Sequence, residues 1–327
     1  MPRICVLHEN DEWVTPLRDA FRARGLPFVE WFLDTGTVDL TTMPPDGVFY
    51  NRMSASSHTR GHRYGPEYAA AVLSWLERHG RRVLNGPRAL TLEVSKVAQY
   101  AALEAGGVRT PRTIAVVGRD ELIGAARGLP LPFITKHNRA GKGLGVRLFR
   151  DYDALTRYVE SDAFEPSVDG ITLLQEYIDA PEPCITRVEF VGGRLLYAVR
   201  VDTSQGFELC PADACRVDDA FCPVGEDAGS LFRIVEGFRH PLVERYERVL
   251  AANDIHIAGI EFIVDRDGVA YTYDINTNTN YNSEAEEAAG QSGMGAIADY
   301  LGLELARLPG FTSRPTSTKL STVEDST

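Results

Sequence analysis

Strand and helix patterns alternate along residues 1–91, and this alternation limits the fold more than any other feature of the sequence. Short apolar runs suited to strands occupy 3–9, 27–32, 47–52 and 81–85. Between them, 13–24 and 65–80 have apolar side chains at helical spacing, with Gly25 and Gly80 as end signals. Strands that alternate with helices form a parallel sheet covered by those helices. We therefore expect an N-terminal α/β domain over 1–91.

The rest of the chain has the patterns of two further lobes. The second lobe starts with a helix at 93–105, followed by strands at 113–117, 132–137 and 145–150 and helices at 120–127 and 151–161. The segment 171–178 opens the third lobe, whose hairpins at 185–202 and 258–276 turn at Gly192-Gly193 and Asp267-Gly268. Helices at 241–253 and 294–308 complete it. We expect α+β lobes over 92–174 and 175–310, and a disordered tail rich in Ser and Thr over 311–327.

Composition and charge exclude several classes of protein. Hydrophobic residues make up 44% and charged residues 24% of the chain, as in ordinary globular proteins. A net charge of −12 argues against a protein that binds nucleic acid or an anionic membrane surface. No apolar run has the length of a spanning helix, and the first residues become acidic too early for a signal peptide. We expect a cytoplasmic protein with no nucleic-acid or membrane partner.

The five cysteines have no metal-binding spacing. Cys210, Cys215 and Cys222 lie close together, but no CxxC pair or nearby histidine completes a zinc set. We expect free thiols.

A glycine-rich loop follows one of the expected strands of the second lobe. The segment KHNRAGKGLG (136–145) begins with Lys136 and contains Gly141, Gly143 and Gly145. Closely spaced glycines let backbone N–H groups approach phosphate oxygens. The segment matches neither the P-loop nor the dinucleotide-binding pattern, so a flexible hairpin loop is an equally good interpretation.

Two acids occupy facing strands of the last hairpin. Glu261 and Asp274 lie on either side of the expected turn, and Asn276 follows two residues later. Two carboxylates and a carboxamide on adjacent strands suit one or two Mg²⁺ ions that hold a polyphosphate. The alternative is a pair of solvent-facing acids, but their neighbours Ile260 and Ile275 indicate strands of the core. Asparagines at every second position from 276 to 282 also suit turns.

Three basic residues complete the set of candidates. Lys96, Arg187 and Arg200 are each, taken alone, typical of solvated surface charges. Arg187 and Arg200 lie on the two strands of the first hairpin, where alternation could place them on one face.

Together these residues resemble the ATP-grasp superfamily, nearest to the RimK-type amino-acid ligases and bacterial glutathione synthetase. The resemblance rests on the order of five elements: Lys96, Lys136 with its glycine loop, the QEYI stretch (175–178), the Arg187/Arg200 hairpin, and Glu261 with Asp274-Ile275-Asn276. It extends from residue 3 to about residue 309. It implies an α/β protein with the ATP-grasp fold, preceded by the N-terminal parallel domain.

The resemblance also implies a role for each candidate. Lys96, Lys136 and Arg187 would contact the phosphates of ATP, and Lys136 and Arg200 would act in catalysis. Glu261, Asp274 and Asn276 would hold two Mg²⁺ ions, with Mn²⁺ as an alternative and Asp274 as the bridging ligand. The remaining nucleotide-binding residues implied are Gly141, Lys142, Gly143 and Gly145 of the loop, Gln175, Glu176, Tyr177 and Ile178 against adenine, and Glu182 near the ribose. Glu182 is included because Ile185 occupies the position where related ligases often have a ribose-binding acid.

The resemblance also implies substrate-binding residues in the N-terminal domain. In the resembled branch, the segment after the third strand contributes an arginine and small hydroxyls to substrate recognition. Arg52, Ser54, Arg60 and Arg63 lie in that segment, and the arginine fork suits a carboxylate. A solvated polar loop is the alternative. Asn278, Asn280 and Asn282 would belong to a substrate-facing loop and not to the metal ligands.

The implied activity is ATP-dependent carboxylate–amine ligation through an acylphosphate, with release of ADP and phosphate. The partners would be a small-molecule or peptide carboxylate and an amine. Members of the branch often form dimers or tetramers, so a homo-oligomer is compatible with the resemblance. Two other functions remain open at this point: a phosphotransferase on the same fold, and a non-catalytic nucleotide-binding regulator.

Overall fold

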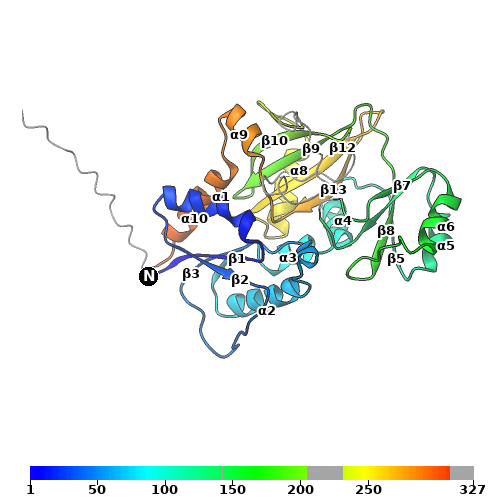
Figure 1. The fold of residues 1–327 in the computed structure, drawn as a ribbon. Helices are drawn as coiled ribbons and strands as arrows, with labels where there is room; N and C mark the ends of the chain where they lie inside the picture. Colours follow the sequence, from blue (N-terminus) through cyan, green and yellow to red (C-terminus); the bar gives the residue numbers. More distant parts are fainter. Residues whose placement is uncertain (142, 205–230, 310–327) are drawn as a thin grey trace, which may run out of the picture.

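The computed structural model describes residues 1–141, 143–204 and 231–309, which form three sheets (Figure 1). Lys142, the three cysteines Cys210, Cys215 and Cys222, and the expected tail at 311–327 lie outside the described residues. Cys5 and Cys184 are free thiols, as expected.

The N-terminal sheet is parallel, as the alternating pattern predicted. Its strand order is β2-β1-β3-β4, with β1 at Arg3–His8, β2 at Phe28–Phe32, β3 at Gly47–Asn51 and β4 at Arg82–Leu84. Helix α1 (Asp11–Ala23) is capped at its N-terminus by Asn10, whose side chain accepts a hydrogen bond from Trp13 N. Ile4 and Val6 of β1 pack in one core cluster with α1, whereas Cys5 and Leu7 pack in another with α2 (Gly65–Arg78). Period-two alternation therefore buries both faces of the sheet. A short 3₁₀ helix, η1 (Ser57–Arg60), precedes α2.

The last helix of the described chain packs on this first domain. Helix α10 (Gly293–Ala306) lies beside α1 in Figure 1, and its Ile297 and Leu301 share a core cluster with Leu17 and Phe21. The Arg24 guanidinium also pairs with Asp299. The N-terminal domain is thus completed by residues that the sequence pattern placed in the third lobe.

The expected helix at 93–105 is α4 (Lys96–Ala105), which starts three residues later than predicted, and it follows a helix that was not predicted, α3 (Pro87–Glu93). The later start occurs because Ser95 caps α4, accepting a hydrogen bond from Ala98 N through its side chain.

The central sheet is antiparallel, in the order β5-β8-β6-β7. Its elements are β5 (Thr113–Val117), β6 (Phe133–His137), β7 (Arg147–Phe149) and β8 (Ile171–Glu176), with α5 (Glu121–Ala126) and α6 (Tyr152–Glu160) packed against it. The prediction that 171–178 opens the third lobe was wrong, because β8 pairs with both β5 and β6. An apolar strand pattern does not specify which sheet the strand joins.

The C-terminal sheet contains both predicted hairpins, in the order β11-β10-β9-β12-β13. Its strands are β9 (Cys184–Val191), β10 (Arg194–Asp202), β11 (Phe232–Val235), β12 (Ile257–Val264) and β13 (Ala270–Asn276), and its helices are α8 (Leu242–Ala252) and α9 (Ser283–Ala289). Gly192 and Gly193 have φ of 62° and 70°, the positive pair that a primed turn requires. Strand β11 and helix α9 were not predicted, and Asn282 caps α9.

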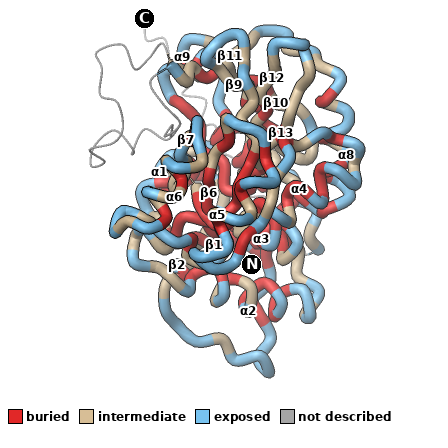
Figure 2. The backbone as a smooth tube through the Cα atoms, turned by 90° about the vertical axis from the view of Figure 1, so that its right-hand side faces the viewer, coloured by how far each residue is buried: buried red, intermediate tan, exposed pale blue. Residues whose placement is uncertain are grey.

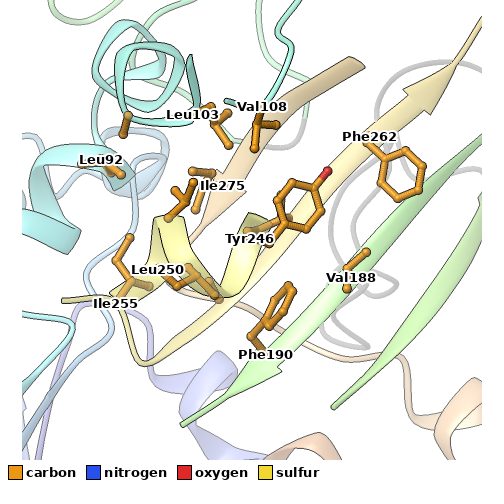
Figure 3. Close-up of a cluster of buried hydrophobic side chains, with 14 of the residues drawn as sticks. Leu92, Leu103, Val108, Val188, Phe190, Tyr246, Leu250, Ile255, Phe262 and Ile275 are labelled. Carbon is orange, nitrogen blue, oxygen red and sulfur yellow. The ribbon is translucent and has the colours of Figure 1, made fainter. Parts of the chain in front are cut away.

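One face of this sheet packs on α3, α4 and α8, and part of the other face packs on α9 and α10. Figure 3 shows Leu92 and Leu103, from α3 and α4, in one cluster with Ile275 of β13 and Tyr246 of α8. Figure 2 shows that buried residues follow the strands, whereas the segment between β2 and β3 is mostly exposed. Within the described ranges, no helix has the length and apolar character needed to cross a membrane.

We expect the stability of the fold to fall in mild acid partly because of His8. This residue is buried at the end of β1, and burial lowers the pKa of its imidazole below the ordinary value of 6.5, despite the opposing effect of Glu30. The unfolded chain therefore binds a proton at His8 that the folded chain does not. The free energy of unfolding should decrease as the pH falls through about 6.5, and His8→Gln should make that decrease smaller. Urea unfolding between about pH 5.5 and 7.5 measures this, and equal slopes for the two proteins would contradict it.

Candidate active site

A cavity of about 420 Å³ is lined by residues from all three sheets or their loops. Ser54 comes from the N-terminal domain, Lys136 and Glu176 from the central sheet, and Arg187 and Asp274 from the C-terminal sheet. The cavity therefore depends on how the three units pack, not on any single motif.

The predicted acidic cluster forms on the cavity side of β12 and β13. Glu261 and Asp274 are direct partners in the antiparallel register, and Asn276 lies two residues farther along β13. All three line the cavity, and Asn276 Nδ2 lies 3.4 Å from Glu261 Oε1. The predicted convergence of these side chains is confirmed. Among the described residues, no cluster of three or more His, Cys, Asp or Glu side chains is placed to hold a metal ion.

Each of the two acids has a cationic partner. Lys96 Nζ lies 2.7 Å from Asp274 Oδ1, and Arg187 Nη1 lies 2.7 Å from Glu261 Oε1. Burial would raise the pKa of Asp274, but Lys96 and Lys136 outweigh burial and lower it. Burial raises the pKa of Glu261, and the nearby Asp274 carboxylate adds to that effect. The site therefore favours one fully ionised carboxylate beside one that protonates more readily.

Arg187 is held on its other side by a second acid, Glu189. Its Nε donates to Glu189 Oε1, and its Nη2 donates to Thr279 Oγ1 at 2.7 Å. Burial alone would lower the pKa of Arg187, but the two carboxylates outweigh it and raise the pKa. Glu189 was missed in the sequence, although it lies two residues after Arg187 on one strand and therefore shares its face.

Lys136 lies deep in the cavity among neutral groups. Its Nζ donates to the Tyr100 hydroxyl at 3.0 Å and lies 5.4 Å from the centre of the Tyr273 ring. Burial lowers the pKa of this ammonium, although Asp274 and Glu261 act in the opposite direction. An anion bound here would relieve the desolvation of the charged lysine.

The QEYI stretch also lines the cavity. Gln175 Nε2 donates to Tyr100 and Thr113, while Glu176 Oε1 accepts from Arg112 N. The lining includes six apolar side chains: Ile134, Leu144, Ile185, Val201, Phe232 and Ile263. Such walls suit a planar aromatic group. Gly141, Gly143, Tyr177, Ile178 and Glu182 also line the cavity; Gly145 does not, but it adjoins Val146, which does.

Arg200 does not share a face with Arg187, and that prediction was wrong. Arg187 pairs with Val199 in the β9–β10 register, and Arg200 pairs with Thr186. A one-residue offset in register reverses the side of the sheet to which a side chain points. The Arg200 guanidinium instead pairs with the Glu182 carboxylate, and it is not among the residues that line the cavity.

The three arginines after β3 do not form the expected carboxylate clamp. Arg52 is 1% exposed and donates to Thr279 O and Asn280 Oδ1, so it fixes the loop after β13. Arg60 pairs with the buried Glu9, and Arg63 donates to Glu67 and to Val168 O. None of the three lines the cavity, whereas Ser54 does. Arg63 and Glu67 are four residues apart, a spacing that the sequence shows, whereas the partners of Arg52 and Arg60 are distant in sequence.

The alternating asparagines from 276 to 280 line the cavity, and the threonines between them make hydrogen bonds within the protein. Asn276, Asn278 and Asn280 line the cavity, and Asn278 Oδ1 is buried without a hydrogen-bond partner. The intervening threonines point the other way, Thr277 to Glu93 and Thr279 to Arg187 and Glu189.

Gly259→Ala should destabilise the protein through Arg187. A Cβ at Gly259 would lie 2.5 Å from Arg187 Nη2 and 2.8 Å from its Cζ, so the paired guanidinium would have to move. We expect the free energy of unfolding to fall by about 1–3 kcal/mol in urea titration. Gly124→Ala in α5 is the matched control, since its Cβ would meet nothing within 4 Å. Equal stability of the two variants would show that Arg187 is not tightly placed.

Comparison with known proteins identifies the fold. No protein-family model matches the chain. The chain is 27% identical over 249 residues to beta-citrylglutamate synthase B of Danio rerio. The aligned residues cover 75% of this chain and 56% of that protein. It thus spans little more than half the length of the curated relative.

Solved structures match over a larger share of the chain. The RimK domain ATP-grasp protein of Sphaerobacter thermophilus has a TM-score of 0.63 at 19% identity, covering 91% of this chain and 98% of that one. The ATP-grasp ligase PsnB, solved with a variant of its minimal precursor, Mg and ADP, has a TM-score of 0.61 at 17% identity, covering 93% and 99%. The chain has the ATP-grasp fold. The predicted likeness to RimK-type proteins is therefore confirmed.

Proposed function

We propose that this protein is an ATP-dependent carboxylate–amine ligase. The observation that carries the proposal is the convergence of Lys96, Lys136 and Arg187 with Glu261 and Asp274 on one cavity. A site for ATP needs cationic side chains to bind the phosphates, and it needs carboxylates to bind a metal ion. The fold brings both kinds of side chain to this cavity.

The donor set fits magnesium. Carboxylate and carboxamide oxygens are the ligands that hard cations prefer, and Glu261, Asp274 and Asn276 supply them on adjacent strands. Lys96 and Arg187, which neutralise the two acids, would be freed to contact phosphate oxygens. PsnB was solved with Mg and ADP, which supports the same cofactors here. We propose two ions, with Mn²⁺ as an alternative and Asp274 as the bridging ligand.

The nucleotide would lie between the phosphate-binding cations and the QEYI stretch. Its base would meet the apolar walls near Ile178 and Ile185, with Glu182 toward the ribose. The loop with Gly141, Gly143 and Gly145 would close over the phosphates, and Lys142 belongs to that same loop. We leave Arg200 out of the proposed catalytic groups, because its side chain points to the other face of the sheet.

The residues of the cavity suit the chemistry of acyl activation. A substrate carboxylate attacks the γ-phosphate, giving an acylphosphate and ADP, and an amine then displaces phosphate to form the amide. Bound Mg²⁺ would neutralise charge on the phosphates. Lys136 and Arg187 would stabilise the charge that develops on the transferred group, and the glycine loop, once closed over the phosphates, would limit hydrolysis of the acylphosphate.

The substrates we propose are an amino acid or a short peptide. The matched relatives include synthases named for citrylglutamate and N-acetylaspartylglutamate, and PsnB was solved with a precursor peptide. We further propose a cytoplasmic protein without nucleic-acid or membrane partners, and a homo-oligomer remains compatible with the branch.

The test is release of ADP and phosphate from Mg-ATP against a panel of amino acids and peptides, supplied singly and in pairs. Mass spectrometry identifies the product. A ligase needs two substrates and forms a product one water lighter than their sum. A single substrate that gains a stable phosphate would favour a phosphotransferase. Nucleotide binding without any turnover across the panel would favour the regulator.

A further inference from the structure

Glu93, the last residue of α3, lies between two loops that both line the cavity. Its Oε1 accepts a hydrogen bond from Ala55 N at 3.2 Å. Its Oε2 accepts from Thr277 N at 2.7 Å, from Thr277 Oγ1 at 2.9 Å and from Asn278 N at 3.3 Å. One carboxylate therefore connects the loop after β3 with the loop after β13.

The residues next to these contacts line the cavity. Ser54 and Ser56 flank Ala55, and Asn276 and Asn278 flank Thr277. Glu93 thus holds one wall from the N-terminal domain against one wall from the metal-binding strand. The two walls adjoin different sheets, so no hydrogen bonds between paired strands set the distance between them.

A neighbouring helix supports the same strand from the other side of Asn276. Gln99 Oε1 accepts from Ile275 N at 3.0 Å, and its Nε2 donates to Ile275 O at 2.8 Å. Asn276 is therefore held between a residue fixed by Gln99 and two residues fixed by Glu93.

The chemistry of the contact requires a carboxylate. All four groups that meet Glu93 are donors, and an ionised carboxylate is a pure acceptor. Glutamine has the same size, but its NH₂ group would face the N–H donors of one loop. Glu93→Gln should therefore break the link between the two loops, so that both lose their support, while leaving the packing of α3 unchanged.

We propose that Glu93 is a positioning residue that couples the two loops and so sets where the amine meets the activated acyl group. This proposal rests on the ligase function proposed above. When the coupling is lost, nucleotide still binds to the lysines and arginine, but the amine is misaligned. Water then competes for the acylphosphate, so more phosphate is released for each amide formed.

The first experiment does not depend on substrate identity. Amide hydrogen exchange of the full chain is compared between the wild type, Glu93→Gln and Glu304→Gln. Glu304 is a matched buried acid on α10, 4% exposed and paired with Arg82, and it does not line the cavity. We expect faster exchange in the segments 54–57 and 276–279 together only for Glu93→Gln. Unchanged exchange in both segments, or a change in only one of them, would overturn the coupling.

The second experiment uses the substrate pair identified by the panel. For Glu93→Gln we expect kcat/KM for the amine to fall about 10–100-fold, with KM for ATP within about twofold. The ratio of phosphate to amide should rise above that of the wild type. A variant that merely lost active protein would keep both the ratio and the KM values, which would overturn the positioning role. If no pair in the panel reacts with the wild type, the ligase proposal fails while the exchange result still decides the coupling.

Discussion

Asp274→Asn is expected to lower ATP-dependent turnover by about 10³-fold or more while the protein stays folded. The Asp274 carboxylate is the partner of Lys96 at 2.7 Å, and the adjacent cations lower its pKa, so it is ionised at neutral pH. Asparagine keeps the shape but removes the charge that a divalent cation needs. Turnover with the identified substrates, measured at saturating Mg²⁺, gives the size of the loss.

The matched control for this substitution is Asp179→Asn. Asp179 also pairs with a cation, Arg266, but both side chains are more than half exposed and neither lines the cavity. Exposed pairs contribute little, so this variant should keep wild-type activity and stability. An Asp274→Asn enzyme within tenfold of the wild type would rule out a metal-binding role for this carboxylate.

Arg187→Met is expected to lower the free energy of unfolding by about 3–5 kcal/mol, the effect of leaving a buried ion-pair partner uncompensated. The substitution removes the cation between Glu189, which is 1% exposed, and Glu261. Urea unfolding at neutral pH measures this loss. Arg194→Met is the control, because Arg194 is largely exposed and pairs with Glu247 at the surface.

The same variant should show a pH dependence of definite sign. Without Arg187, which lowers the pKa of Glu261, burial would raise that pKa further above the unfolded value, so the folded state would bind a proton more tightly than the unfolded state. The deficit relative to the wild type should then be smaller near pH 5 than near pH 8. A deficit below about 1 kcal/mol, equal at both pH values, would mean that water or another group solvates the acids.

The site could be predicted from the sequence wherever a side chain's position follows from local periodicity. Glu261, Asp274 and Asn276 converge because a hairpin register and period-two alternation require it. The same alternation would have found Glu189 beside Arg187, and the three-residue helical spacing from Lys96 would have indicated Gln99. The prediction for Arg200 was wrong because Arg187 pairs with Val199 and not with Arg200. Adjacent residues of a strand point to opposite faces, so this offset of one residue places Arg200 on the other face of the sheet.

The amino-acid sequence by itself determined the parallel N-terminal sheet, the two hairpins, the order of the motifs and the acid pair, because strand and helix periods and glycine turns are local properties. Only the tertiary structure decided which sheet β8 joins, that α10 completes the N-terminal domain, and where Arg52 and Arg60 find their partners. These outcomes depend on contacts between distant segments. A guanidinium pairs with whichever acceptor the packing of the three sheets brings within reach, and no spacing along the chain encodes that distance.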